Sequence, residues 1–255
     1  MPEDIKGLHH VTSMAADAQQ NNDFFTKTLG LRRVKKTVNF DAPDVYHLYY
    51  GDEAGSPGTV MTYFPFPHIR RGRPGTGEVS ETLFAVPRGS LGFWTERLAR
   101  QGVAGLEAHE RFGERRLRFR GPDGDGFALV EVEGDPRTPW AGGPVPADEG
   151  VHGFRGVSLR LRDAGATAEL LRFMGYEEVE RQGATTRFAI EGNGADVIDV
   201  ETLAVAEPAR QGAGSVHHVA FAVEDRAHLG QALKLPGQHA HLRPRLEQML
   251  PEIRD

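Results

Sequence analysis

Cysteine is absent from the 255-residue sequence. Its absence excludes disulfide bonds, thiolate metal ligands and cysteine nucleophiles. A metal site in this chain would have to be built from histidine, aspartate or glutamate, which are the ligands of non-haem iron, manganese and catalytic zinc.

Positive charge is also scarce. The 30 Lys and Arg residues are outnumbered by 36 Asp and Glu residues, for a formal net charge of −6, whereas a nucleic-acid-binding surface usually needs a basic excess. No apolar run approaches the length of a membrane span, and the N-terminus, "MPEDIKG", lacks a signal pattern. We therefore expect a cytoplasmic protein whose partners include neither nucleic acid nor a membrane. The sequence leaves open whether the chain forms a homo-oligomer.

The sequence does contain one strand-like motif that is repeated four times. The first and last copies each hold a His-His pair followed by Val, and the two middle copies are weaker. The copies are "GLHHVTSMAAD" (7–17), "SETLFAVP" (80–87), "RGVSLRLRD" (155–163) and "SVHHVAFAVED" (215–225). Aligned on their last residues, they place His10, Ser80, Gly156 and His218 at one equivalent position.

Each of the first three copies is followed by a helix-like segment and then by strand-like runs. The helix-like segments span 21–30, 90–102 and 166–175, and each ends at a glycine. This order predicts an α+β fold of tandem β-α-β-β-β modules with antiparallel or mixed sheets, three of them complete within residues 7–214. The stretch "GPDGDGF" (121–127) fits neither a phosphate loop nor a calcium loop and is predicted to be a β-turn.

The fourth module is much shorter than the others. Only 11 residues separate His218 from Leu229, whereas the preceding copies are spaced by 62 to 76 residues. We therefore expect that a segment of roughly fifty or more residues belongs between Asp225 and Leu229. In the tail, leucines at a four-residue spacing predict one amphipathic helix packed on the body. These leucines are Leu242, Leu246 and Leu250.

Four phrases resemble the ring-cleaving dioxygenases that open hydroquinones, a branch of the vicinal oxygen chelate superfamily that also contains glyoxalases and bleomycin-resistance proteins. The phrases are "GLHHVTSMA", "YHLYYGDEAGSPGTVMTYFP", "ERFGER" and "SVHHVAFAV". The resemblance covers residues 7 to about 225 and implies that paired modules curve their sheets around a metal-containing cup. Residues 1–145 would form the N-terminal pair of modules. Residues 146–255 would form the C-terminal pair, whose second module is incomplete, and the helical tail.

The two histidine pairs are the candidate metal ligands. Neighbouring side chains face opposite sides of a regular strand, so we expect one histidine of each pair to face the cup and the other to point away. The resemblance implies that His10 and His218 hold Fe(II), or else Mn(II) or another divalent ion, together with a glutamate on the last strand of the fourth module. That glutamate is not in this sequence. Ala128 stands at the corresponding place in module two, and we expect no replacement from another module.

Other side chains near these ligands have assignments of their own. By position in the resembled family, His9, Thr12 and His217 are catalytic: the imidazoles move protons and the hydroxyl orients a reacting group. The alternative is that the two histidines cap strand starts and the threonine fills a β position. His47 is predicted to be a packed, hydrogen-bonded histidine. Phe112 lines either an aromatic substrate pocket or the core.

These observations together predict a non-haem Fe(II)-dependent dioxygenase that opens hydroquinone-like aromatic diols with O₂. Two alternatives remain open. The first is a glyoxalase-like lyase or isomerase that uses another divalent metal in the same cup. The second is a non-catalytic small-molecule-binding protein of the same fold.

Overall fold

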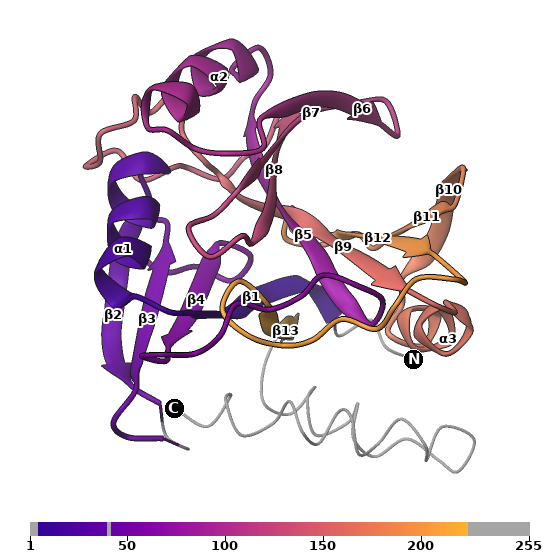
Figure 1. Ribbon diagram of the computed structural model, residues 1–255. Coiled ribbons are helices and arrows are strands. Elements are labelled where there is room, and N and C mark those ends of the chain that lie inside the picture. The colour runs from indigo at the N-terminus through magenta and orange to yellow at the C-terminus, as the bar shows by residue number, and fades with distance from the viewer. Residues whose placement is uncertain (1–4, 40–41, 224–255) are drawn as a thin grey trace.

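The computed structural model describes residues 5–39 and 42–223. Its strands form one sheet of five strands and one of eight, and Figure 1 shows that both curve strongly. The junction at residues 225–229 and the tail leucines lie outside the described residues. None of the helices in the described part is long and apolar enough to cross a membrane.

Three β-α-β-β-β modules follow one another, as the repeat predicts. Module one consists of β1 (Ile5–Ala15), α1 (Ala18–Asp23) with the π-helical turn η1 (Phe24–Thr28), β2 (Arg32–Val38), β3 (Tyr46–Gly51) and β4 (Val60–Pro65). Module two consists of β5 (Glu78–Pro87), α2 (Leu91–Arg100), β6 (Glu107–Arg111), β7 (Glu114–Arg120) and β8 (Gly126–Val132). Module three consists of β9 (Gly153–Leu161), α3 (Gly165–Phe173), β10 (Glu177–Gln182), β11 (Thr185–Ala189) and β12 (Val197–Thr202). The described part of module four is β13 (Val216–Val223).

The sheets join modules that are not always neighbours along the chain. The first sheet has the order β13-β1-β4-β3-β2, so it combines module one with the first strand of module four. The second sheet has the order β10-β11-β12-β9-β5-β8-β7-β6 and combines modules two and three. In each sheet the first strands of two modules pair with each other antiparallel. Each first strand also pairs in parallel with the last strand of its own module, where that strand is described. The sheets are therefore mixed, as predicted.

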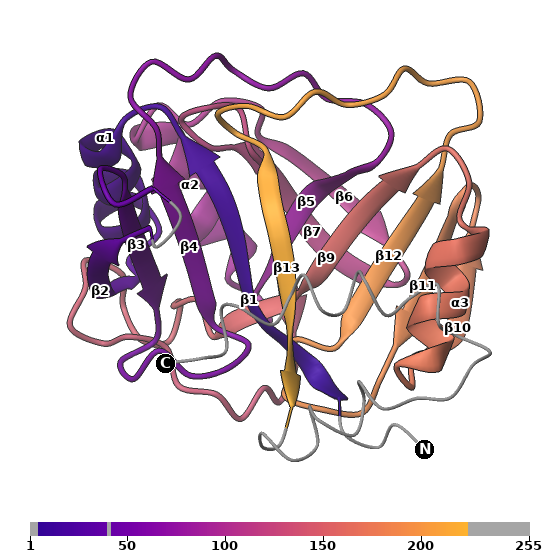
Figure 2. The ribbon, with the colours of Figure 1, turned by 90° about the horizontal axis from the view of Figure 1, so that it is seen from below.

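Strand pairing crosses the boundary expected at residue 145. β5 and β9 lie on opposite sides of that boundary along the chain but are neighbours in one sheet, as Figure 2 shows. The division into residues 1–145 and 146–255 therefore describes the order of modules along the chain and not the sheets. As a division into domains it stays a prediction.

The helices α2 and α3 begin within one residue of the expected positions, whereas α1 begins at Ala18, three residues before the expected 21–30 segment. The Asp17 side chain accepts a hydrogen bond from the Gln20 amide at 2.7 Å and caps α1. The three helical segments end just before Gly30, Gly102 and Gly175, whose φ angles are +74°, +69° and +91°. Only glycine adopts this left-handed conformation without steric cost, which explains why each segment closes on one.

The stretch 121–126 is the turn between β7 and β8, as predicted, and it also fastens module two to module one. Asp125 in this turn is buried and accepts hydrogen bonds from the Tyr63 hydroxyl at 2.6 Å and from the Ser13 hydroxyl at 3.3 Å. Asp123 accepts one from the amide of Ala16 at 3.0 Å. Burial raises the pKa of Asp125 to about 6, against an ordinary value of 3.8.

This raised pKa predicts a pH dependence of stability. Folding favours the protonated carboxyl, so the contribution of Asp125 is fully present below about pH 4 and is lost as the pH rises through 6. The loss amounts to at most about 3 kcal/mol. Asp125→Asn removes the titration, so its free energy of unfolding, measured by urea denaturation, should fall less than that of the wild type between pH 4 and pH 7. The surface variant Glu133→Gln should follow the wild type, and equal slopes for Asp125→Asn and wild type would contradict the assignment.

Candidate active site

Four histidines form a row on β1 and β13, the two neighbouring strands at one end of the first sheet. β1 and β13 pair antiparallel, and this pairing brings His10 and His218, which are 208 positions apart, to an Nε2–Nε2 distance of 3.1 Å. His9 lies beside His10 with 3.0 Å between their Nδ1 atoms, and His217 lies beside His218 with 2.8 Å between theirs. The row is symmetric: the inner pair meets through Nε2, and each inner ring meets its outer neighbour through Nδ1.

The expectation that the two histidines of each pair point opposite ways is wrong. The rings of His9 and His10 are in contact, as are those of His217 and His218, with centroids 5.1 Å apart in both pairs. The pairing of β1 with β13 explains why the side chains do not alternate. At each outer histidine, one strand advances by two residues while the other advances by one. The partners on either side are Leu8 with Phe221 and His10 with Ala220 at one place, and Thr12 with His218 and Ser13 with Val216 at the other. Each outer histidine is thus the extra residue of a β-bulge, which breaks the alternation of side chains.

The inner pair fits the geometry of two metal ligands. Two imidazole nitrogens that bind one ion from adjacent positions, each at about 2.0–2.1 Å, lie about 3 Å apart, which matches the 3.1 Å between His10 and His218. Among residues 5–39 and 42–223, no group of three or more His, Asp or Glu side chains could hold a metal ion. The described part of the chain therefore supplies two donors of such a site.

The outer histidine on β1 is partly buried. Burial, and secondarily the charge of His10, lowers the pKa of His9 to about 4. The His9 imidazole is therefore neutral at pH 7, in the form that can accept a hydrogen bond from a neighbouring ring nitrogen.

A second row of polar side chains runs from β3 across β4 to β1. The Tyr49 hydroxyl lies 2.7 Å from Nδ1 of His47, Nε2 of His47 lies 2.9 Å from the Thr62 hydroxyl, and that hydroxyl lies 2.7 Å from the Thr12 hydroxyl. Thr12, Thr62 and His47 are all buried. His47 is thus a packed, hydrogen-bonded histidine, as predicted. Thr62 was not among the predicted site residues, because nothing in "VMTYFP" distinguishes it from an ordinary strand threonine.

Aromatic rings connect the two rows. The His47 ring lies 4.1 Å from the Tyr49 ring and 4.3 Å from the Phe64 ring, measured between centroids. The Phe64 ring in turn meets the His217 ring edge to face at 5.7 Å. The histidine row therefore has an aromatic wall on the side of β3 and β4.

Phe112 lies in the other sheet. It is buried at the turn between β6 and β7, where its amide donates to the Gln182 side chain at 2.9 Å. The guanidinium of Arg187 lies 4.4 Å from the centre of its ring. Of the two readings of Phe112, the structure supports packing and places it away from the histidine row.

The second sheet repeats the paired bulges with different side chains. Ser80 and Arg155 are the extra residues there, because Val79 and Glu81 pair with Leu159 and Ser158, and Leu83 and Phe84 pair with Gly156 and Phe154. The place of His10 is therefore taken by Glu81 and not by Ser80, which corresponds to His9. The aligned phrases misplaced Ser80 by one residue because a bulge cannot be read from the pattern of apolar residues. Gly156 corresponds to His218, as predicted.

Module three does carry a carboxylate at the position equivalent to Ala128, where we expected no replacement for the glutamate ligand. Asp199 pairs with Ser158 in the same way that Ala128 pairs with Leu83 and Thr62 pairs with Thr12. Asp199 is fully buried, and it accepts hydrogen bonds from Arg116 at 3.0 Å and from Arg187 at 2.7 Å. These two guanidinium groups neutralise the carboxylate, so the second cup holds an ion-pair network.

Glu114 extends this network. Its carboxylate accepts hydrogen bonds from Arg116, Arg155 and Arg187 at 2.8–2.9 Å. Burial alone would raise the pKa of Glu114, but the hydrogen bond and charge of Arg187, with the charges of Arg155 and Arg116, outweigh it and hold the value at about 2. The carboxylate is therefore ionised throughout the physiological pH range.

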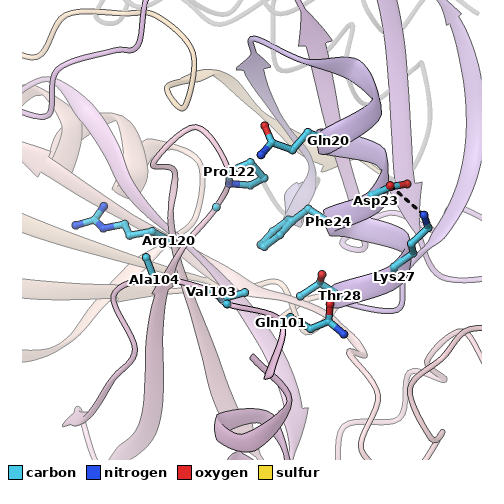
Figure 3. Close-up of a pocket in the computed structure, with 12 residues that line it drawn as sticks. Gln20, Asp23, Phe24, Lys27, Thr28, Gln101, Val103, Ala104, Arg120 and Pro122 are labelled. Carbon is cyan, nitrogen blue, oxygen red and sulfur yellow. Dashed lines mark hydrogen bonds and ion pairs between the residues drawn. The ribbon is translucent and has the colours of Figure 1, made fainter. Parts of the chain in front are cut away.

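A cavity of about 500 Å³ opens elsewhere, between η1 and the loops of module two. Figure 3 shows Phe24, Val103 and Arg120 at this cavity, with Lys27 paired to Asp23 at its rim. No histidine of either row lines it. The cavity is thus separate from the candidate active site.

Comparison with known proteins shows where this geometry belongs. Residues 7–129 match the family described as glyoxalase/bleomycin resistance protein/dioxygenase superfamily. A Bacillus subtilis protein that carries the name of a ring-cleaving dioxygenase, MhqO, is 39% identical over 88% of this chain and 72% of its own length. The chlorohydroquinone/hydroquinone 1,2-dioxygenase of Sphingobium indicum is 37% identical over 88% of this chain and 73% of its own length. The chain belongs to this superfamily.

Structural similarity agrees with this assignment. A crystal structure of a protein from Bacillus subtilis named as a dioxygenase superposes with a TM-score of 0.85 at 38% identity, covering 89% of this chain and 73% of the other. With the named relatives, this identifies the superfamily member as an enzyme of the ring-cleaving dioxygenase kind.

The network in the second cup predicts a stability effect. Asp199→Ala removes one of the two carboxylates that neutralise the buried guanidinium groups of Arg116 and Arg187 and leaves them only Glu114, so the free energy of unfolding should fall by about 3–5 kcal/mol. Urea denaturation measures this loss as a lower midpoint. Glu133→Ala is the control, because its ion pair with Arg88 is exposed and should contribute about 1 kcal/mol or less. Similar midpoints for the two variants would contradict a stabilising role for the network.

Proposed function

We propose that this dioxygenase uses Fe(II) bound by His10 and His218 to open hydroquinone-like aromatic diols with O₂. The observation that carries the proposal is the approach of two imidazole Nε2 atoms to 3.1 Å, each backed by a further histidine. The named activities of the relatives support the reaction and the substrate class. Fe(II), when bound, would supply adjacent coordination sites and a path for electrons from the aromatic ring to O₂, which makes their reaction accessible.

The outer histidines prepare the inner ones for this role. An imidazole that ligates through Nε2 carries its proton on Nδ1 and commonly donates it to a neighbouring group. His9 and His217 stand at that place, with their own Nδ1 atoms 3.0 Å and 2.8 Å from those of the inner rings. When the outer rings accept these hydrogen bonds, each inner ring keeps its proton on Nδ1 and a lone pair on the facing Nε2 atom. The catalytic roles expected for His9 and His217 would thus include fixing the tautomer of each ligand.

The aromatic wall supports an aromatic substrate. The rings of His47, Tyr49 and Phe64 lie next to the histidine row, and flat aromatic faces pack well against a planar ring. Thr12, two residues along β1 from His10, carries a hydroxyl that can bind an oxygen of a diol held at the histidines. A glyoxalase-like lyase would show metal-dependent turnover without O₂ consumption, and a binding protein would show neither.

Removing one ligand tests the proposal. Purified as the complete protein, with the segment expected between Asp225 and Leu229, the wild type should bind about one Fe(II) per chain and consume O₂ with a hydroquinone. His10→Ala should abolish both, because a single remaining histidine of the pair holds a ferrous ion poorly. Iron analysis and an oxygen electrode give the two readings.

The exposed variant His68→Asn is the matched control, since it removes a histidine from a loop outside both rows. It should behave as the wild type does. Full iron content and O₂ consumption in His10→Ala would show that the histidine row is not the metal site.

A further inference from the structure

The row Tyr49–His47–Thr62–Thr12 has no role in the function proposed so far. Three adjacent strands contribute to it, and its three contacts, at 2.7, 2.9 and 2.7 Å, form an unbroken path that ends at Thr12. Thr12 and His10 are two residues apart on β1 with no bulge between them, so their side chains share one face of the sheet. The path therefore leads from the aromatic wall to the histidine row.

The position of the proton on His47 limits the direction of the hydrogen bonds in such a path. A hydroxyl has a single proton to donate, and a neutral imidazole donates through one nitrogen and accepts through the other. If Tyr49 donates to Nδ1 of His47, then Nε2 donates to Thr62, the Thr62 proton is available for Thr12, and the Thr12 proton can be donated elsewhere. If Tyr49 instead accepts from Nδ1 of His47, then Nε2 accepts from Thr62, and Thr12 donates its proton to Thr62.

The first direction is the stronger one. A phenol is a better donor than a neutral imidazole N–H, and an imidazole nitrogen is a better acceptor than a phenol oxygen. The 2.7 Å between the Tyr49 hydroxyl and Nδ1 of His47 is a short distance that suits an O–H donor. In this direction Thr12 keeps its proton for a ligand.

Comparison with module two shows that the fold does not require these hydroxyls. The positions of Thr12 and Thr62 are taken there by Leu83 and Ala128, which pair in the same register and pack together in an apolar cluster. A polar pair in module one at a place where the fold accepts an apolar pair points to a role in binding.

We propose that His47 and Thr62 are positioning residues that orient the Thr12 hydroxyl as a hydrogen-bond donor to an oxygen of the bound aromatic diol. This rests on the proposed function for the identity of the ligand. The direction of the hydrogen bonds can be measured without ligand or metal, so the positioning role and the proposed function can be disproved separately.

Nitrogen-15 NMR of the metal-free protein tests the direction. His47 should be a single tautomer that carries its proton on Nε2 and has an unprotonated Nδ1. In Tyr49→Phe the acceptor at Nδ1 loses its donor, so the other tautomer should appear. A wild-type His47 protonated on Nδ1 would reverse the row and overturn the proposal.

Steady-state kinetics of the iron-loaded enzyme with a hydroquinone test the role. Thr62→Val keeps the shape of the side chain but breaks the path, so kcat should fall about tenfold, the effect of one misdirected hydrogen bond. KM should change by about twofold or less, because a bond to a developing charge acts mainly on the reaction step. Thr62→Ser restores the hydroxyl and should recover most of kcat.

Thr82→Val is the matched control. Thr82 is a strand threonine in the second sheet that is as buried as Thr62, at 1% exposed, and its hydroxyl has no partner. It should keep the wild-type kcat. An unchanged kcat in Thr62→Val, or equal losses in Thr62→Val and Thr62→Ser, would overturn the positioning role. A wild type that binds iron but consumes no O₂ would overturn the proposed function and the identity of the ligand, whereas the NMR result would still decide the direction of the row.

Discussion

The antiparallel pairing of β1 with β13 is the constraint on which the candidate site depends. It joins the first module to the fourth and brings together His10 and His218 from 208 positions apart. The two bulges within this pairing matter as much as the pairing itself. In a regular ladder His9 and His217 would face away from their neighbours, and no ring contact could form within either pair. Because each strand has one extra residue at its bulge, the two His-His pairs form a row of four imidazoles in contact.

The second sheet shows that this geometry does not by itself make a metal site. β5 and β9 repeat the pairing and both bulges, yet Glu81 and Gly156 stand where the inner histidines stand in the first sheet. Asp199, on the last strand of module three, occupies the position that Thr62 has in module one. The guanidinium groups of Arg116 and Arg187 supply the positive charge around it. The fold thus repeats one strand pairing with its two bulges in both sheets, and the side chains decide what each pairing can hold.

The sequence predicted what depends on local pattern. The repeat, the glycine-ended helices and the mixed sheets follow from periodicity and turn residues, and the candidate pair His10 and His218 follows from duplication. The errors have one physical origin, which is that bulges and cross-strand neighbours are set by pairing between distant segments. An alignment without bulges misplaced Ser80 and missed that His9 contacts His10. Thr62 and Asp199 could not be singled out, because their importance comes from partners on other strands.

β1 connects the histidine row, the path to His47 and the contact with module two, because its two edges and one of its faces each have a different partner. Its edge toward β13 carries the histidine row, and its edge toward β4 carries Thr12 and the path to His47. Its opposite face is tied to module two, since Ser13 donates to Asp125 in the turn that also binds Tyr63. Side chains that act together must be held within a fraction of an ångström. A strand held by partners on both edges and on one face satisfies that requirement, and it carries both the proposed ligand His10 and the proposed donor Thr12, two residues apart.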